Sequence, residues 1–476
     1  MQEEHTFQRR LTLFDSTAIV VGSMIGSGIF IVSADIARMV GSPGWLMAVW
    51  VITGIMTIFA ALSYGELAGM FPKAGGQYVY LKEAYNPLTG FLYGWTLFLV
   101  IQTGTIAAVG MAFAKFLGVM IPWISEEIVW YHQGFFKFGP VQLIAIGSIA
   151  FLTWVNTMGI QKGKRVQNAF TSGKFLLLIL FIILGIAFAS NQYAIDANKS
   201  IYWNPAQAGS GGTELPLAGI ALVAALGMAM VGSLFSSDAW NNITFTAGEV
   251  INPRKNIPMS LFLGTLIVTI LYLLANYVYI SVLPVRGSPE GVDAAARGMQ
   301  YAVNDRLGTA AISAIFGSYA VVIMAGFIVI STFGCNNGLI LSGARVYYAM
   351  AVDGIFFKKV GKLNEKGVPA AGLIFQGIWA GLLCLSGTYG QLLDYVVFAV
   401  LIFYVLTILG LFRLRKTRPE AERPYKAFGY PVIPLTYITL ALTVMTILFI
   451  YKPVYTWPGL IIVILGIPVY YLWRKK

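Results

Sequence analysis

Two runs of small and polar residues lie inside segments that are otherwise apolar enough to cross a membrane. The first covers residues 22–30 (GSMIGSGIF) and the second covers residues 232–242 (GSLFSSDAWNN). Each glycine lowers helix stability by about 1 kcal/mol relative to alanine, so the first run favours a break in its helix. A broken helix at membrane depth is tolerated only where it lines a cavity. The alternative for the first run alone is close packing of helices through small residues.

The positions of the two runs favour the first interpretation. They fall in the first and the sixth apolar segments of the chain. This is the arrangement expected of two inverted five-helix repeats, in which interrupted helices at corresponding positions mark a binding site near the middle of the membrane. We therefore interpret the two runs as the two sides of one binding site.

Lys174 is the third residue whose type and position suggest chemistry. It lies one to two turns inside the fifth apolar segment, in the sequence Phe170-Thr171-Ser172-Gly173-Lys174-Phe175. Ionisable residues inside a membrane are functional candidates by default, which favours an ammonium group pointing into the bundle. The alternative is a lysine that extends its side chain to the membrane surface.

The amino-acid composition indicates which kind of structural element must position these residues. Of the 476 residues, 58% are hydrophobic and 11% are charged. Soluble domains have a charged share of about 25%, so the chain is predicted to be an all-α polytopic membrane protein. Twelve apolar stretches are long enough to cross a bilayer. They are residues 12–38, 44–71, 87–120, 140–160, 169–189, 216–247, 258–283, 309–349, 370–387, 391–412, 431–451 and 456–473.

The net charge of +12 is distributed unevenly along this topology. With a cytoplasmic N-terminus, the inner segments hold 22 lysines and arginines and the outer loops hold seven. The positive-inside rule therefore predicts that both termini are cytoplasmic. Because this placement accounts for the basic charge, we expect a membrane lipid environment and no nucleic-acid partner.

The scarce histidines and cysteines argue against other classes. An enzyme would bring a nucleophile, a base or a metal together, but the two histidines, His5 and His132, lie in the N-terminal tail and in an outer loop. A channel would carry rings of identical ligands, which two central breaks do not provide. Cys335 and Cys384 both fall in predicted helices, so no loop thiol is available for a disulfide. We expect no enzyme activity, no cofactor and no metal.

Several motifs together resemble the amino acid, polyamine and organocation (APC) transporter superfamily, and most closely its L-type amino acid transporters. They are the break at 26–30 (GSGIF), the loop at 71–76 (FPKAGG), the run from Phe235 to Asn241 that leads to Glu249 and Asn252-Pro253, and the run from Arg345 to Gly354. The resemblance covers nearly the whole chain. It implies one transmembrane domain over residues 1–476 with a LeuT-like fold. Helices 1–5 would cover about 12–189, helices 6–10 about 216–412, and two peripheral helices about 431–473.

The chemistry of the breaks suits an α-amino acid, which presents a carboxylate and an ammonium group at a fixed separation. Backbone N–H groups at the start of a half-helix can bind the carboxylate, and exposed carbonyl groups can accept hydrogen bonds from the ammonium group. The expected N–H donors are Gly26, Ser27 and Gly28, and the expected carbonyl acceptors are Ser23, Met24, Phe235 and Ser236. Specificity is then left to the side chains of Asp238, Asn241 and Gln102.

The resemblance also implies roles for individual side chains. Phe235 would be the gate that closes over the substrate, while Tyr272 and Asn241 would brace the site and the first helix. Lys174 matches the lysine that sodium-independent members carry where sodium-coupled relatives bind sodium. The resemblance therefore implies sodium-independent transport at the cell membrane by alternating access, with amino acid exchange. The alternative is proton-coupled uptake of an amino acid or amine.

Two departures from the family pattern matter. Asp238 stands where many carriers of neutral amino acids have a small residue, so we hypothesise that cationic or strongly polar substrates are accepted besides neutral ones. The alternative is that Asp238 bonds to neighbouring backbone N–H groups and stabilises the break. The outer loop at 122–139 has no cysteine, so we expect no disulfide-linked heavy chain and a carrier that can act as a monomer.

Overall fold

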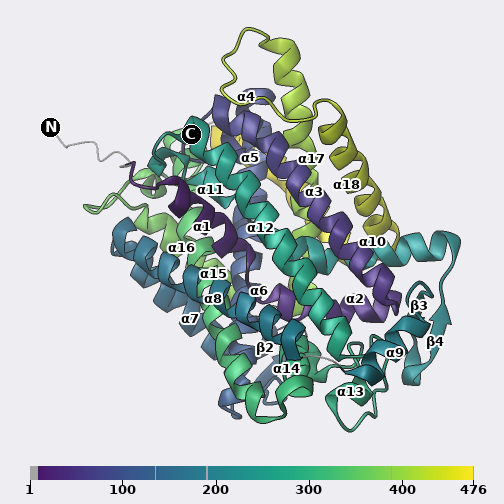
Figure 1. Cartoon of the computed structure of the whole chain (residues 1–476). Helices are drawn as coiled ribbons and strands as arrows, with labels where there is room; N and C mark the ends of the chain where they lie inside the picture. Colours follow the sequence, from purple (N-terminus) through teal and green to yellow (C-terminus); the bar gives the residue numbers. More distant parts are fainter. Residues whose placement is uncertain (1–8, 135, 189–190, 387–388, 475–476) are drawn as a thin grey trace.

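The computed structural model describes residues 9–134, 136–188, 191–386 and 389–474, and this part of the chain is a bundle of helices (Figure 1). In these ranges, eleven helical stretches are long and apolar enough to cross a membrane, judged by length and composition. The chain is therefore a multi-pass membrane protein. The strands are confined to two short antiparallel hairpins, β1 (Tyr131–Gln133) with β2 (Phe136–Phe138), and β3 (Ala206–Ala208) with β4 (Glu214–Pro216).

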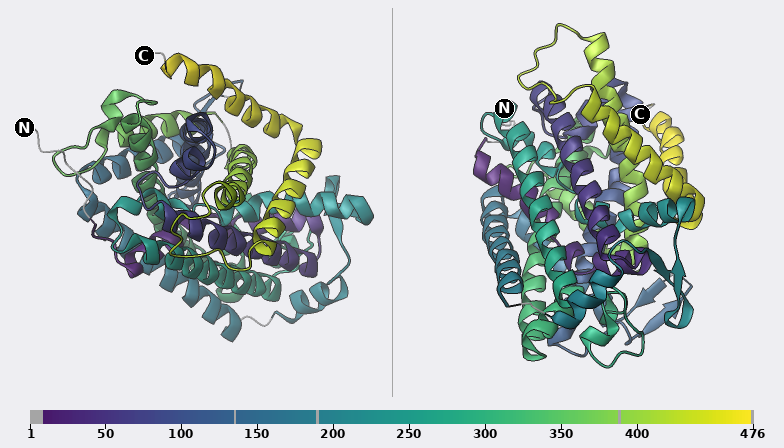
Figure 2. Two further views of the ribbon diagram at one scale, coloured as in Figure 1. Left: turned by 90° about the horizontal axis from the view of Figure 1, so that it is seen from above. Right: turned by 45° about the vertical axis from the view of Figure 1, so that its right-hand side comes forward.

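The long apolar helices without an interruption are α3 (Pro43–Met70), α7 (Pro140–Thr157), α8 (Ile160–Phe188), α12 (Pro253–Val282), α15 (Tyr319–Val352), α17 (Tyr389–Thr417), α18 (Val432–Tyr451) and α19 (Pro453–Arg474). Shorter helices connect them: α4 (Gln77–Ala84), α9 (Gln192–Ser200), α13 (Ala294–Arg297), α14 (Leu307–Phe316) and α16 (Ala370–Leu383). In Figure 2, α18 and α19, olive to yellow, run along the outside of the bundle.

The structure differs from the expected apolar segments in two places, of which the first affects the count of crossings. The ninth expected segment, 370–387, contains α16, which has only 14 residues. We expected the eighth segment, 309–349, to be one continuous stretch, and this prediction was wrong. Gly317 divides this segment into α14 and α15. The φ of Gly317 is +79°, a backbone conformation that glycine adopts easily but that does not occur within an α-helix.

The two ends of the bundle are distinct. The end of α19, the first described residues and α4 lie together at one end, which we call the α4 end, and both hairpins lie at the opposite end, the hairpin end (Figures 1 and 2). Contacts between side chains agree with this arrangement. Lys82 of α4 bonds Asp353 after α15, and the ring of Trp473 in α19 packs against Phe357.

The first apolar segment is broken, as its glycines predict. It consists of α1 (Leu13–Met24), a short 3-10 turn η1 (Gly28–Phe30) and α2 (Val32–Val40). A capping box between Thr12 and Asp15 starts α1, which satisfies N–H groups that a helix start would otherwise leave unpaired. The helix ends where residues 25–27 leave the helical path.

The sixth apolar segment is broken at the second run. α10 (Gly219–Ser236) is followed by non-helical residues, and the chain becomes helical again in the short α11 (Asn242–Phe245) and the 3-10 turn η4 (Ala247–Glu249). Ala239 in this gap has a φ of +65°, a strained conformation for a residue with a side chain. Such strain is often found at functional sites.

The third apolar segment carries a different irregularity. It begins as α5 (Pro87–Thr96), passes through the π-helical stretch η2 (Leu97–Ile101) and continues as α6 (Gln102–Met120). A π-helical turn shifts the side chains that follow it and is frequent at functional sites. Gln102 is the first residue after this shift.

Glu66 fastens the segment between α17 and α18 to the α4 end of α3. Its fully buried carboxylate accepts hydrogen bonds from Arg415 (2.5 Å), from Arg423 (3.1 Å) and from the backbone N–H of Ala427 (2.7 Å). Arg415 also stacks on the ring of Tyr430, 3.7 Å from its centre. One carboxylate thus pairs with two arginines and holds the connecting segment in place.

Replacing Glu66 by alanine should destabilise the fold. Arg415 and Arg423 would lose their shared anion, and removing one partner of a buried ion pair costs about 3 kcal/mol. We expect a clear fall in the thermal unfolding midpoint of the detergent-solubilised protein. Glu420→Ala is the matched control, because Glu420 is an exposed carboxylate of the same connecting segment. Equal midpoints for the two variants would contradict the anchoring role.

Candidate functional site

Tyr272 of α12 holds the two breaks together. Its hydroxyl lies 2.9 Å from the carbonyl oxygen of Met24 and 3.2 Å from that of Ser236. These are the last residues of α1 and α10, where carbonyl groups lose their partners within the helix. The ring of Tyr272 is itself held edge-on against Trp50 of α3, with ring centres 5.4 Å apart.

Lys174 of α8 lies at the break in the first segment. Its side chain is 2% exposed, and its ammonium group donates to the carbonyl oxygens of Gly22 and Ile25, the second at 2.8 Å. The Ser331 hydroxyl of α15 lies 3.4 Å from the Ile25 carbonyl oxygen. Lys174 therefore points into the bundle, as expected, and the alternative of a lysine that extends to the membrane surface is wrong.

The glycines of the first break allow close contact with neighbouring helices. A methyl group on Gly28 would lie 2.0 Å from the Ser236 hydroxyl oxygen, and one on Gly26 would lie 2.9 Å from the Cys335 sulfur. In the described part of the chain, the N–H groups of Gly26 and Gly28 donate no main-chain hydrogen bond. They stay available as donors, and Ser27 lies between them at the same break.

The carbonyl groups expected to accept from a substrate already have protein contacts. Cys335 lies 3.1 Å from the Ser23 carbonyl oxygen, and the N–H of Asp238 donates to that of Phe235 at 3.1 Å. Met24 and Ser236 share Tyr272, as described. A carbonyl oxygen has two lone pairs, so those of Ser23, Met24 and Ser236 can each accept one further hydrogen bond.

Asp238 lies in the gap of the sixth segment and bonds across to α17. The Tyr404 hydroxyl donates to its carboxylate at 2.5 Å, and the backbone N–H of Ala239 lies beside the same group. Among the described residues, no lysine, arginine or histidine nitrogen lies within 4.0 Å of it. A carboxylate at membrane depth without a cationic partner is costly and marks a functional site.

The side-chain amides of Gln102 and Asn241 both donate hydrogen bonds to other groups of the protein. Gln102 donates to the carbonyl oxygen of Leu339 in α15 at 2.7 Å. Asn241 donates to the side-chain oxygen of Gln77 in α4 at 3.0 Å, and Gln77 donates in turn to Thr407 at 3.0 Å. The Asn241 amide is therefore directed to α4, and its bracing of the first helix stays a prediction.

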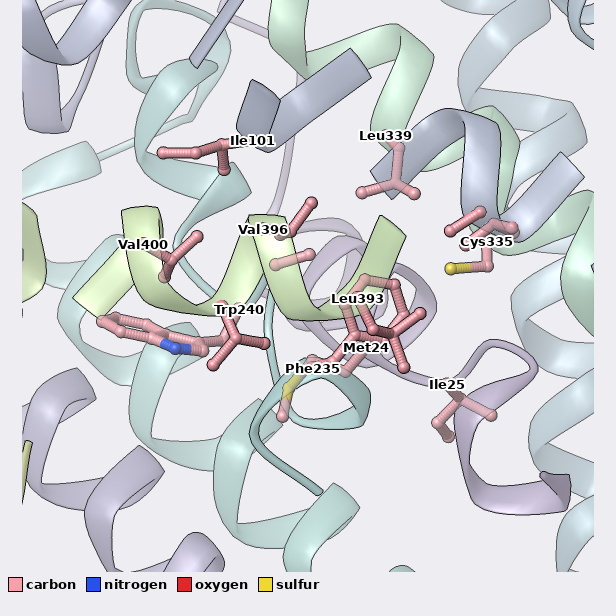
Figure 3. Packing of buried hydrophobic residues seen from close by; sticks show 14 of the residues in the cluster. Met24, Ile25, Ile101, Phe235, Trp240, Cys335, Leu339, Leu393, Val396 and Val400 are labelled. Carbon is pink, nitrogen blue, oxygen red and sulfur yellow. The ribbon is translucent and has the colours of Figure 1, made fainter. Parts of the chain in front are cut away.

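Phe235 is buried at the end of α10. It belongs to the same cluster of buried apolar side chains as Met24 of α1 and Leu393 of α17 (Figure 3). Leu393 also lines a large cavity at the hairpin end of the bundle. Ile31 and Gly232 line the same cavity, so it lies next to both broken segments.

The cavities differ strongly between the centre and the hairpin end. Two small cavities of about 10 and 20 Å³ adjoin Asp238 and Tyr404, and each holds about one water molecule. The cavity at the hairpin end measures about 490 Å³ and is lined in part by charged residues, including Asp35, Arg38 and Asp394. An amino acid can enter the central site only after side chains move.

The α4 end is closed by a layer of polar contacts. Arg345 of α15 donates to Glu249 at 3.1 Å, and both side chains are buried. The backbone N–H groups of Arg10 and Leu11 donate to the carbonyl oxygen of Glu249 at 2.8 and 2.9 Å, and the N–H of Ile251 donates back to Leu11 at 2.8 Å. These contacts join the segments that enter and leave the two broken helices.

Three residues of the site were not anticipated from the sequence. They are Tyr404, which bonds Asp238, and Gln77 and Asn242, which line the smaller central cavity. Gln77 follows Gly75-Gly76 in a loop that reads as a simple turn. Asn242 ends the second polar run, and its position there was the available signal.

Comparison with known proteins agrees with this geometry. A model of the family described as amino acid permease matches residues 11–470. The chain is 28% identical over 465 residues to the b(0,+)-type amino acid transporter 1 of Mus musculus, covering 95% of this chain and 84% of the relative. It is 29% identical over 477 residues to the large neutral amino acids transporter small subunit 2 of Homo sapiens, covering 98% and 82%. The chain therefore belongs to the amino acid permease family of the APC superfamily, and it resembles the L-type amino acid transporters.

Proposed function

We propose that this protein carries amino acids across the cell membrane by sodium-independent alternating access, and that it exchanges one amino acid for another. The observation that supports this most is the pair of helix breaks held together by Tyr272. The N–H groups at the first break suit a carboxylate, and the carbonyl groups at both breaks suit an ammonium group. A backbone site of this kind recognises what all α-amino acids share.

The sodium-independent mechanism rests on Lys174. Its ammonium group already donates to the carbonyl oxygens of Gly22 and Ile25. Carbonyl oxygens at a broken helix are typical ligands for a transported sodium ion. Because a protein cation occupies them here, no sodium ion is needed to satisfy them.

We propose an alternating cycle in which the α4 end opens after the hairpin end closes. The cavity of about 490 Å³ lies at the hairpin end, while the Arg345–Glu249 ion pair closes the α4 end. Substrate that enters from the hairpin end would pass Phe235, which would act as the gate. The ion pair at the other end would then separate.

The distribution of basic residues supports an orientation in the membrane, and the two helix breaks support an inverted repeat. We propose that the α4 end faces the cytoplasm, because the basic residues of the sequence gather in the segments on that side. Both termini would be cytoplasmic. We also propose twelve crossings in a single domain, with two inverted five-helix repeats and with α18 and α19 outside them.

We propose that the protein works without a disulfide-linked heavy chain, and that it can function as a monomer. Cys335 and Cys384 are its two cysteines, and both are buried in the bundle. Neither thiol is available to a partner subunit. The site calls for no cofactor or metal and for no catalytic step.

Asp238 supports a wider range of substrates. We propose that neutral amino acids are accepted together with cationic or strongly polar ones, because the carboxylate of Asp238, which has no cationic partner among the described residues, lines the central cavities. One of the relatives is named a b(0,+)-type transporter, and this name agrees with such a range.

Uptake of labelled leucine into proteoliposomes should require amino acid inside. An empty carrier would have to change conformation with the polar groups of both breaks lacking their substrate, which is costly in a membrane. We expect at least about tenfold faster uptake with internal leucine and no change when sodium is replaced by choline.

A pH gradient serves as the control for the alternative mechanism. Uptake that is driven by the gradient without internal substrate would instead support proton-coupled transport. Strong sodium dependence would contradict the role of Lys174. Absence of transport across a full amino acid panel would overturn the proposed function.

Asp238→Ala should reduce uptake of lysine and arginine at least about tenfold relative to leucine, because a cationic side chain would lose its counter-charge. The measurement is kcat/KM for each substrate in the same proteoliposomes. Asp238→Asn, which removes the charge and keeps the size, should also reduce uptake of lysine and arginine relative to leucine. An unchanged ratio of lysine to leucine uptake would refute the role of Asp238 in substrate choice.

A further inference from the structure

Asn242 is the residue of the central cavity that the proposed function has not used. It is the first residue of α11, it is 2% exposed, and it lines the same cavity of about 10 Å³ as Asp238. Its side-chain nitrogen, Nδ2, has no hydrogen-bond partner within the described ranges. Leaving a buried amide donor unpaired is unfavourable, so such a group suggests a missing ligand.

The other three amides of this cavity do not share this property. Gln77 donates to Thr407, Gln102 donates to Leu339, and Asn241 donates to Gln77. Their donor groups link α4 to α17, α6 to α15, and the residue before α11 to α4. Among the four amide side chains that line this cavity, only that of Asn242 donates no hydrogen bond to the described part of the protein.

Asp238 supplies the complementary acceptor. Tyr404 donates one hydrogen bond to it, whereas an ionised carboxylate can accept about four. Asp238 and Asn242 both line this cavity, which has room for about one water molecule. A substrate group that enters here would lie beside one residue that can accept a hydrogen bond and one that can donate.

We propose that this pair selects amino acids with a carboxamide side chain, which are asparagine and glutamine. This inference rests on the proposed amino acid transport. The NH2 group of the substrate carboxamide donates to Asp238, and its carbonyl oxygen accepts from Asn242. A carboxamide therefore satisfies both protein groups at once.

Other side chains satisfy only part of the pair. An ammonium or guanidinium group pairs with Asp238 but carries no acceptor, so Asn242 stays unpaired beside a positive charge. An apolar side chain leaves both groups unsatisfied. Sites built to hydrogen-bond a substrate reject analogues that lack the bonding group.

Matched substrates test the selectivity directly in proteoliposomes with the full chain. Leucine is the apolar isostere of asparagine, and homoleucine is that of glutamine. We expect kcat/KM for asparagine and glutamine to exceed that of their isosteres, and that of lysine, by at least about tenfold. Equal values for asparagine and leucine would overturn the inference.

Two variants assign the selectivity to Asn242. Asn242→Leu removes the donor at similar size, and it should lower the ratio of asparagine to leucine about tenfold without reducing the ratio of lysine to leucine. Asn242→Asp replaces the donor by a second carboxylate, and it should raise lysine uptake relative to asparagine. Thr265→Val is the matched control, because its buried hydroxyl donates within α12, to Leu261 at 2.8 Å.

The outcomes separate this inference from the proposed function. Transport of leucine with no preference for asparagine refutes the carboxamide site and leaves amino acid transport standing. An unchanged asparagine-to-leucine ratio in Asn242→Leu, with leucine uptake intact, also refutes it. Should both variants fail to fold, the comparison of isosteres in the wild type still decides.

Discussion

The structure depends on how it satisfies backbone groups that two interrupted helices leave unpaired inside a membrane. Hydrocarbon offers no partner to a free carbonyl or N–H group. Tyr272 reaches Met24 and Ser236, the last residues of α1 and α10, and Lys174 reaches the carbonyls of Gly22 and Ile25. Both partners come from helices outside the breaks. The breaks can therefore persist without a substrate and still offer donors and acceptors when one arrives.

This arrangement separates two tasks of the site. Backbone groups at the breaks suit the part that all amino acids have in common. Side chains of the sixth, third and tenth apolar segments line the smaller central cavity, and they include Asp238, Gln102 and Tyr404. In the proposed carrier, changes in these side chains would alter the substrate range while the backbone and its supports stay the same.

Local patterns predicted the class, the breaks and the placement of Lys174, because apolar length, glycine runs and a charge within an apolar segment are properties of short stretches. Contacts between distant segments could not be predicted in this way. Asp238 and Tyr404 are 166 residues apart, and Asn241 and Gln77 are 164 apart. Their meeting depends on how helices cross. The division of the eighth segment at Gly317 was missed because one glycine in an apolar stretch looks like helix interior.

The contacts of Glu249 make the closed α4 end a cooperative unit. Its backbone carbonyl receives the N–H groups of Arg10 and Leu11, while its side chain receives Arg345. A movement of η4 that breaks the ion pair would also strain the hydrogen bonds to Arg10 and Leu11. Conversely, loss of those hydrogen bonds would leave the Glu249 carboxylate less firmly held beside Arg345. In the proposed cycle, the α4 end would therefore open in one concerted event. An intermediate with a half-open α4 end would carry a buried, unpaired charge, and this cost keeps its population low.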